Sequence, residues 1–176
     1  MMDIYRFVTR WWCAFALLAS LSLLAAAHAF EVYGGLAPCA LCLKQREVLW
    51  AAAGLSAMGT AWALISRARG TPRITAFLLF AIFATSAIVA GYHAGGELKW
   101  WDLPATCSGG GGQVDLSQLS AFLDGTARAR PPMCDVVAWS WLGISMAGWN
   151  ALISVVLAVI SLIASRRPED ARAPRS

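Results

Sequence analysis

Four long segments of the chain contain no aspartate, glutamate, lysine or arginine, and this feature limits the possible folds more than any other. The segments cover residues 11–30, 48–66, 74–93 and 141–164. A helix of about 20 apolar residues spans the roughly 30 Å hydrocarbon core of a bilayer. Helices and closed barrels alone satisfy their backbone in lipid, and the sequence lacks the short alternating segments of a barrel. We therefore expect an all-α membrane protein, built as a four-helix transmembrane bundle.

The composition agrees with this fold class. Hydrophobic residues make up 59% of the chain and charged residues 14%, against roughly 45–50% and about 25% in ordinary soluble domains. Such a chain has too little polar surface to cover a water-soluble globule. A soluble enzyme or a soluble binding module is therefore excluded.

The apolar pattern also sets approximate boundaries for one domain over residues 1–165. In the second of its two outer loops, Leu116, Leu119, Phe122 and Leu123 have the spacing of one helix face, which predicts a short helix on the membrane surface. Residues 27–29 resemble a signal-peptide cleavage site, but the preceding apolar run exceeds the roughly 7–15 residues of a signal, so we expect the first helix to be retained. We place the helices at approximately 11–30, 46–66, 74–93 and 140–164, the outer loops at 31–45 and 94–139, and a tail at 166–176.

The positive charges predict the orientation in the membrane. Most basic residues lie before the first apolar segment, between the second and third, or after the fourth. By the positive-inside rule, both termini and the loop at 67–73 are then cytoplasmic. The net charge of +4 therefore reflects topology, and we expect no nucleic-acid partner. The basic residues on this side are Arg6, Arg10, Arg67, Arg69, Arg73, Arg166, Arg167, Arg172 and Arg175.

Two cysteines, Cys39 and Cys42, lie three positions apart just before the second apolar segment. Pro38 before them suits the first turn of a helix. At a helix N-terminus, unpaired N–H groups and the helix dipole favour a thiolate, which is the reactive form of a thiol. The spacing is typical of a redox dithiol, but alone it also fits half of a zinc site or a structural disulfide.

Four of the five cysteines fall in the two outer loops, because Cys107 and Cys134 lie in the second. Paired thiols outside the bacterial cytoplasm form disulfides. Four thiolates can also bind zinc, but a zinc site gives no role to the charged and titratable residues at the membrane edge. Two exchangeable disulfides fit the pattern better. Cys13, inside the first apolar segment, is expected to be structural.

Two polar residues mark the outer ends of neighbouring helices. Arg46 follows Cys42 by four positions, so both share a helix face. Its alternative role is an interfacial anchor whose charged head reaches water. His93 ends the third apolar segment, where an imidazole could bind a headgroup, a water or a bound carbonyl group. The two side chains can lie close together.

From about residue 17 to residue 164, the chain resembles the DsbB family, disulfide bond formation protein B. The local marks of this resemblance follow one another in order on the predicted side of four helices. They are Pro38-Cys39-Ala40-Leu41-Cys42 with Gln45-Arg46, Tyr92-His93 with Gly95 and Glu97, Pro104-Ala105-Thr106-Cys107, Pro132-Met133-Cys134-Asp135, and Trp139-Ser140-Trp141-Leu142-Gly143-Ile144-Ser145-Met146.

The resemblance implies a bacterial inner-membrane thiol:quinone oxidoreductase. Such a protein reoxidises a periplasmic thioredoxin-like dithiol oxidase (DsbA-like) and passes the electrons to ubiquinone or menaquinone. The resemblance also implies that Cys107 makes the bond with that partner and that Cys42 faces the quinone. Arg46 would hold a quinone oxygen, with His93 beside it.

Four cysteines allow three pairings. We prefer Cys39–Cys42 with Cys107–Cys134, and an interloop Cys42–Cys107 or Cys39–Cys134 bond could be a transient step. The sequence is also compatible with other functions. They are service to one dedicated partner such as a sulfotransferase, vitamin K epoxide reductase-like activity, a disulfide-stapled scaffold, and a zinc-binding protein.

Overall fold

The structure is a computed structural model that describes residues 2–65, 71–104, 107 and 133–166. Four of its helices are long and apolar enough to cross a membrane, which confirms the predicted four-helix membrane fold. The elements are α1 Met2–Arg10, α2 Trp12–Val32, α3 Ala40–Ile65, α4 Arg73–Glu97, β1 Ser140–Trp141, β2 Ile144–Ser145 and α6 Met146–Ser165.

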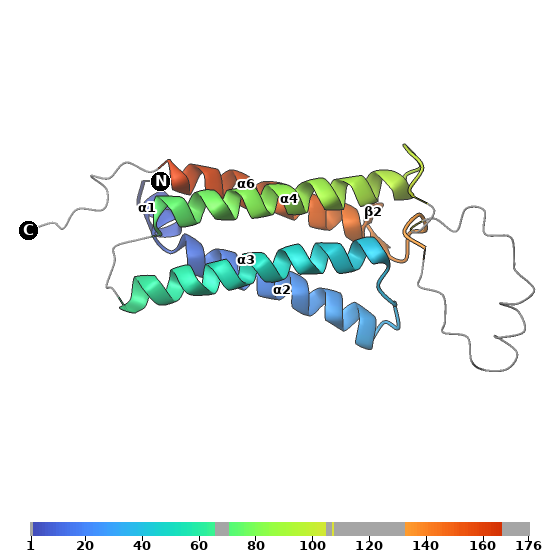
Figure 1. Cartoon of the computed structure of the whole chain (residues 1–176), viewed down its shortest axis with the longest axis horizontal. Helices are drawn as coiled ribbons and strands as arrows, with labels where there is room; N and C mark the ends of the chain where they lie inside the picture. The colour runs from blue at the N-terminus through green and yellow to red at the C-terminus, as the bar shows by residue number, and fades with distance from the viewer. Residues whose placement is uncertain (1, 66–70, 105–106, 108–132, 167–176) are drawn as a thin grey trace, which may run out of the picture.

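The four long helices run side by side in an elongated bundle (Figure 1). α2 packs against α3, and α4 packs against α6 and α3. In Figure 1 the short helix α1 lies at the left-hand end of the bundle, and the hairpin β1–β2 lies at the opposite end. We call this opposite end, which carries Cys39 and Cys107, the cysteine end.

Small side chains fill much of the bundle interior. Ala16, Ala52 and Ala76 are fully buried, as are Leu79 and Phe83. In contrast, large apolar side chains project outward on every spanning helix. Small residues let helix backbones approach closely in lipid, where outward apolar side chains carry no penalty. Leu18, Met58, Ile88 and Val156 are examples of the outward residues, each more than half exposed.

Cys13 contributes to this close packing. Its side chain is 3% exposed, and a Cβ atom added to Gly59 would lie 2.6 Å from its sulfur. Only glycine at that position therefore lets α3 approach α2 so closely. Cys13 is packed as a small apolar residue far along the bundle from the other cysteines.

The helix boundaries differ from those expected at the cysteine end. α3 begins at Ala40 rather than near 46, because the Cys39 sulfur accepts a hydrogen bond from the Cys42 N–H at 3.3 Å and so caps the helix. α4 continues to Glu97 rather than ending at 93. Its final turn contains Gly95 and Gly96, and added Cβ atoms there would collide with Trp101 and Leu103. The two glycines allow the chain to fold back over the helix end.

The fourth spanning helix begins at Met146 instead of about 140. Residues 140–145 instead form a two-stranded antiparallel hairpin in which Trp141 pairs with Ile144. The turn needs positive φ angles at Leu142 and Gly143, of 53° and 77°, and a helix cannot continue through them. Ser145 then caps α6 by accepting a hydrogen bond from the Gly148 N–H at 3.1 Å.

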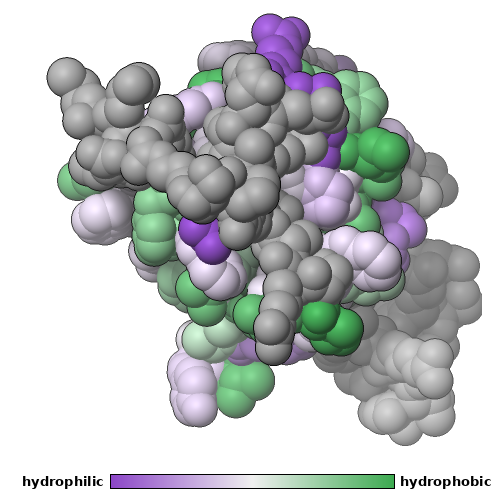
Figure 2. Space-filling model, turned by 90° about the vertical axis from the view of Figure 1, so that its left-hand side faces the viewer, coloured by the Kyte–Doolittle hydropathy of each residue, from purple (hydrophilic) through white to green (hydrophobic). Residues whose placement is uncertain are grey.

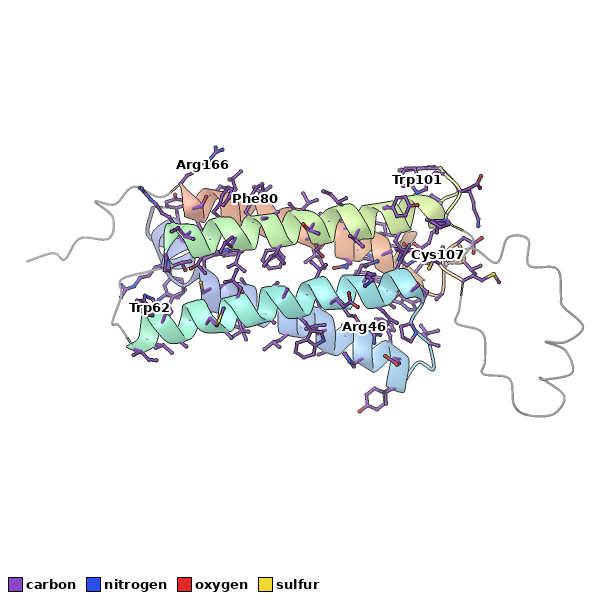
Figure 3. The ribbon with its side chains drawn as sticks, in the orientation of Figure 1. Arg46, Trp62, Phe80, Trp101, Cys107 and Arg166 are labelled. Carbon is purple, nitrogen blue, oxygen red and sulfur yellow. The ribbon has the colours of Figure 1, made fainter. Side chains whose placement is uncertain are left out.

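The end of the bundle with the chain termini mixes charged and apolar residues. Figure 2 views this end and shows scattered hydrophilic residues among hydrophobic ones. Arg10, Arg73 and Arg166 are exposed, and Figure 3 labels Arg166 at this end. The helix α1 was not expected from the apolar pattern. The predicted surface helix at 116–123 and most of the predicted tail, from 167 onward, lie outside the described residues.

Candidate functional site

The first cysteine pair is built by the start of α3. Cys39 directly precedes the helix and Cys42 lies in its first turn, which brings the two sulfur atoms to 3.0 Å. Cys39 is buried, with 4% of its surface exposed, and Cys42 is half-buried. The structure holds all five cysteines as thiols. In the structure, the two cysteines therefore form a close pair of thiols at a helix N-terminus, as their spacing in the sequence suggested.

The second pair is brought together by loop backbone. The Cys134 N–H donates to the Cys107 carbonyl oxygen at 2.6 Å. The Cys134 thiol interacts with the thiols of both Cys39 and Cys107, and the four cysteines pack together around Leu103. The sulfurs therefore form a row in the order Cys42, Cys39, Cys134, Cys107. Figure 3 labels Cys107 at this end of the bundle.

Hydrogen bonding decides where protons reside in this row. The hydrogen bond from Cys39 to Cys42, together with burial, raises the pKa of Cys39 to about 12. When the first pair loses one proton, the negative charge therefore lies on Cys42. Burial also raises the pKa of the Cys134 thiol. Cys39 and Cys134 therefore remain largely protonated at neutral pH while they are buried.

His93 lies at the centre of the site. Its Nε2 atom is 3.7 Å from the Cys39 sulfur and 3.1 Å from the Cys134 carbonyl oxygen. Its Nδ1 atom is 2.9 Å from the Gln45 side-chain nitrogen. A carboxylate oxygen of Glu97, whose side chain is 6% exposed, lies 3.8 Å from Nε2. The imidazole therefore touches the cysteine row directly.

Arg46 is held mainly by α2. It forms an ion pair with Glu31 and donates to the Ala27 carbonyl oxygen at 3.0 Å. Its side chain is 14% exposed. No contact joins Arg46 to His93 in the described part of the chain, but both line the same cavity. Two residues of α2 therefore hold the guanidinium group in position. Its remaining N–H groups can donate hydrogen bonds to a ligand.

That cavity has a volume of about 480 Å³, within the roughly 300–1,000 Å³ usual for small-molecule sites. Its wall is mostly apolar, with residues from α2, α3 and α6 and from the segment before α6. Cys42, Arg46 and His93 are among the few polar groups at its surface. A flat apolar ring with carbonyl oxygens, such as a quinone, matches this combination in size and chemistry.

Two cysteines and the histidine of the site could also hold a metal ion. The ligand atoms of Cys39, Cys42 and His93 lie within 4.8 Å of one another. Two sulfurs and an imidazole nitrogen suit a soft metal such as zinc. This geometry requires the reduced cysteines, because a disulfide has no thiolate to offer.

Several polar residues of the site were not expected to be functional. Gln45 and Asn150 hydrogen-bond to each other at 2.6 Å, and Glu31 and Glu97 contact Arg46 and His93. The sequence does contain an indication for two of these residues, Asn150 and Glu97. Asn150 lies within an uncharged apolar segment and Glu97 lies just beyond another, and polar side chains at membrane depth usually have a functional reason.

Comparison with known proteins identifies the family of the chain. The sequence profile of the family described as "Disulfide bond formation protein DsbB" matches residues 9–164. A "Disulfide bond formation protein B" from Methylococcus capsulatus is 28% identical over 81% of this chain and 85% of its own length. A "Disulfide bond formation protein B 2" from Pseudomonas entomophila is 32% identical over 84% of both chains. No solved structure gives a significant match. The chain is therefore a multi-pass membrane protein that belongs to the DsbB family of disulfide bond formation proteins.

Proposed function

We propose that the chain is a protein-dithiol:quinone oxidoreductase of the bacterial inner membrane. It would reoxidise a periplasmic thioredoxin-like dithiol oxidase (DsbA-like) and pass the electrons to ubiquinone or menaquinone. One observation carries this proposal. A row of four sulfurs runs from the half-buried Cys107 to Cys42, which lines an apolar cavity.

The order of the sulfurs supports a relay of thiol–disulfide exchanges. A thiolate of the soluble partner attacks Cys107 in a Cys107–Cys134 disulfide, and the electron pair of that bond passes to Cys134. The Cys134 thiolate then attacks Cys39, which breaks the Cys39–Cys42 disulfide and leaves the charge on Cys42. The second partner thiolate attacks the partner sulfur joined to Cys107 and so releases the oxidised partner.

The close approach of Cys39 and Cys134 favours an interloop bond between these two cysteines over one between Cys42 and Cys107. Freed Cys107 would resolve that bond by attacking Cys134, which releases Cys39 as a thiolate. Cys39 and Cys42 then form their disulfide again as the electron pair leaves through Cys42.

A bound quinone supplies the final oxidant, since it takes up a pair of electrons and a pair of protons. Arg46 would donate a hydrogen bond to a quinone oxygen and stabilise negative charge there and on Cys42. Arg46 and Cys42 both line the cavity. Glu31 would keep the guanidinium group in place through its ion pair.

The topology of the proposal rests on charge. Arg10, Arg73 and Arg166 are exposed at the end of the bundle away from Cys39. By the positive-inside rule that end would be cytoplasmic, and the cysteine end would face the periplasm. Oxidising conditions there allow the disulfides to persist.

The test is quinone reduction by the purified protein in detergent, with a reduced thioredoxin-like oxidase as the electron donor. Wild type, Cys39→Ser and Cys107→Ser are compared, with Cys13→Ser as the matched control. We expect turnover in the wild type and in Cys13→Ser and none in the other two variants. A small dithiol donor should restore quinone reduction in Cys107→Ser but not in Cys39→Ser. No wild-type turnover with several donors and both quinone classes would refute the proposal.

The cluster of Cys39, Cys42 and His93 favours zinc binding as a second candidate function. A non-catalytic zinc protein should retain about one equivalent of zinc after purification and should show unreactive thiols. Metal analysis and thiol titration of the same preparation separate the two functions. A metal-free protein with readily exchanged disulfides would exclude the zinc function.

A further inference from the structure

A chain of hydrogen-bonded polar side chains leads from His93 into the apolar interior of the bundle. Gln45 contacts His93 at 2.9 Å, and Asn150 donates to the Gln45 oxygen at 2.6 Å. Ser154 donates to the Asn150 oxygen at 3.5 Å and contacts the Ser86 hydroxyl at 2.9 Å. Both serines are fully buried. Polar groups at this depth are costly, so their arrangement calls for a reason.

A backbone carbonyl fixes the direction of this chain at its outer end. The Cys134 carbonyl oxygen lies 3.1 Å from His93 Nε2 and can only accept a hydrogen bond. Nε2 must therefore carry the hydrogen. A neutral imidazole has one N–H group, so Nδ1 must accept, and Gln45 must present its NH₂ group to it.

The rest of the chain follows from that first step. With its NH₂ group on His93, Gln45 turns its oxygen towards Asn150, which donates its own NH₂ group. The Asn150 oxygen then accepts from the Ser154 hydroxyl. Every bond of the chain is satisfied in this one direction.

The reverse arrangement fails at His93. If both amides were turned over, Nδ1 would carry the hydrogen and donate to the Gln45 oxygen. The lone pair on Nε2 would then face the Cys134 carbonyl oxygen and the Glu97 carboxylate, 3.1 and 3.8 Å away. Facing acceptors repel one another, and one Glu97 oxygen already lacks a hydrogen-bond partner.

We propose that Gln45 and Asn150 are positioning residues that hold His93 in the Nε2–H tautomer, so that the Cys134 carbonyl oxygen and the Cys39 sulfur share its one N–H donor. The Nε2 atom lies 3.7 Å from that sulfur, a distance suited to an N–H donor and a sulfur acceptor. The role in catalysis rests on the proposed function, whereas the tautomer does not.

The tautomer matters when Cys39 leaves as a thiolate. In that step Cys107 forms a bond with Cys134, the Cys39–Cys134 bond breaks, and its electron pair passes to Cys39. The His93 N–H stabilises the new charge without giving up its proton. An imidazole with a lone pair at Nε2 would repel the same thiolate.

The experiment is nitrogen NMR of protein labelled with ¹⁵N in its histidine rings, recorded in detergent micelles without donor or quinone. The chain has only two histidines, and His28→Gln assigns both. His28 is the internal reference, because its Nδ1 contacts the Leu24 carbonyl oxygen at 2.8 Å and so prefers the opposite tautomer. We expect His93 to carry its hydrogen on Nε2.

Two variants on different helices should place an acceptor at Nδ1, which gives either the Nδ1–H tautomer or a doubly protonated ring. Gln45→Glu replaces the donor to Nδ1 with a carboxylate that can only accept. Asn150→Asp makes the neighbour accept from the Gln45 NH₂ group, which turns the Gln45 oxygen towards His93. Thr85→Ala is the matched control, since it removes an exposed hydroxyl of α4 that bonds only the Ala81 carbonyl oxygen.

A variant whose ring has lost Nε2–H should release Cys39 about 10- to 100-fold more slowly, which is the effect of losing a hydrogen bond to a charged group. A variant with a doubly protonated ring keeps that donor and should not be slowed. Stopped-flow quinone reduction with reduced partner measures this rate, and Thr85→Ala should change it by less than about twofold. Unchanged helix content and thermal midpoint show that each variant folds, and the two variants guard against one that does not.

The outcomes separate this inference from the proposed function. An Nδ1–H tautomer or a doubly protonated ring in the wild type would overturn the inference, whatever the activity. An unchanged rate in a variant with a reversed tautomer would overturn the catalytic role. An Nε2–H tautomer in a protein without turnover would support the hydrogen-bond assignment and refute the proposed function.

Discussion

The two cysteine pairs are held by different parts of the fold. Cys39 and Cys42 belong to the start of one helix, which alone sets their sulfurs 3.0 Å apart. Cys107 and Cys134 come from distant points in the sequence and are joined by a backbone hydrogen bond and by an interaction of their thiols. The first pair is therefore defined by local geometry, whereas the second depends on how a loop lies against it. The difference suits a fixed pair at the membrane and an exchangeable pair outside it.

The largest expected effect tests which members of the two pairs meet. With Cys42→Ser and Cys107→Ser combined, the remaining Cys39 and Cys134 should form an interloop disulfide in most molecules under mild oxidation. With Cys39→Ser and Cys134→Ser combined, we expect less than about a tenth as much bond, because the sulfur row separates the remaining cysteines. Peptide mapping without reductant measures both yields. Equal disulfide yields from the two double variants would contradict the proposed order of the four sulfurs.

The next effect concerns the cavity, which is lined by both cysteines of the first pair, Cys39 and Cys42. Arg46→Ala should raise the apparent quinone KM or lower the rate of quinone reduction by about 10- to 100-fold, because a charge-assisted hydrogen bond is lost. Glu31→Gln should act in the same direction but more weakly, since the cation remains. Exchange with the soluble partner should not change in either variant. Unaltered quinone kinetics in Arg46→Ala would exclude the assigned role.

A smaller effect tests the coupling within the first pair. The hydrogen bond to Cys42 raises the pKa of Cys39 to about 12, so little Cys39 thiolate exists at neutral pH. Cys42→Ala removes that bond and should lower this pKa. The rate of Cys39 alkylation at about pH 8 should then rise by about tenfold for each unit that the pKa falls. Iodoacetamide labelling of the reduced protein, followed by mass spectrometry, measures the rate. A slower reaction would contradict the proton assignment.

The smallest effect concerns the loop next to the second pair. The Lys99 ammonium group, 2.9 Å away, holds the pKa of Asp135 below its usual range. A lowered pKa means that the carboxylate stabilises the fold above its unfolded-state pKa and loses this effect as the pH falls through its folded-state pKa. Asp135→Asn should therefore lower the thermal midpoint slightly at neutral pH and not at all in strong acid. Differential scanning calorimetry at both pH values is the measurement, and a difference that persists in acid would contradict the assignment.

Much of the fold was predictable because membrane-spanning helices can be recognised from their composition. Uncharged segments of sufficient length gave four helices in the correct places. Their ends were less predictable, since they depend on local contacts. The Cys39 cap moved the start of α3, and the positive φ angles at Leu142 and Gly143 replaced a turn of helix with a hairpin. Neither the helix cap nor the turn produces a periodic pattern of apolar residues that could be recognised in the sequence.

The site was predictable only in part. The cysteine spacing pointed to the dithiol, and the structure places both Arg46 and His93 at one cavity. The Glu31 partner of Arg46 and the amide pair of Gln45 and Asn150 could not be foreseen, because they join different helices. Which residues of separate helices meet depends on the rotation of each helix about its own axis, and a single sequence does not encode that rotation in any simple pattern.

The polar chain behind His93 gives the bundle interior an electrical property without placing a charge in it. Gln45, Asn150, Ser154 and Ser86 carry no formal charge, yet their hydrogen bonds point the same way, so that the small dipoles add towards the Cys39 sulfur. A permanent cation at this depth would be costly in every state of the protein. In the proposed relay, these oriented neutral groups would instead act as a fixed solvent for the Cys39 thiolate that forms during turnover. The polar chain itself adds no formal charge to the bundle interior.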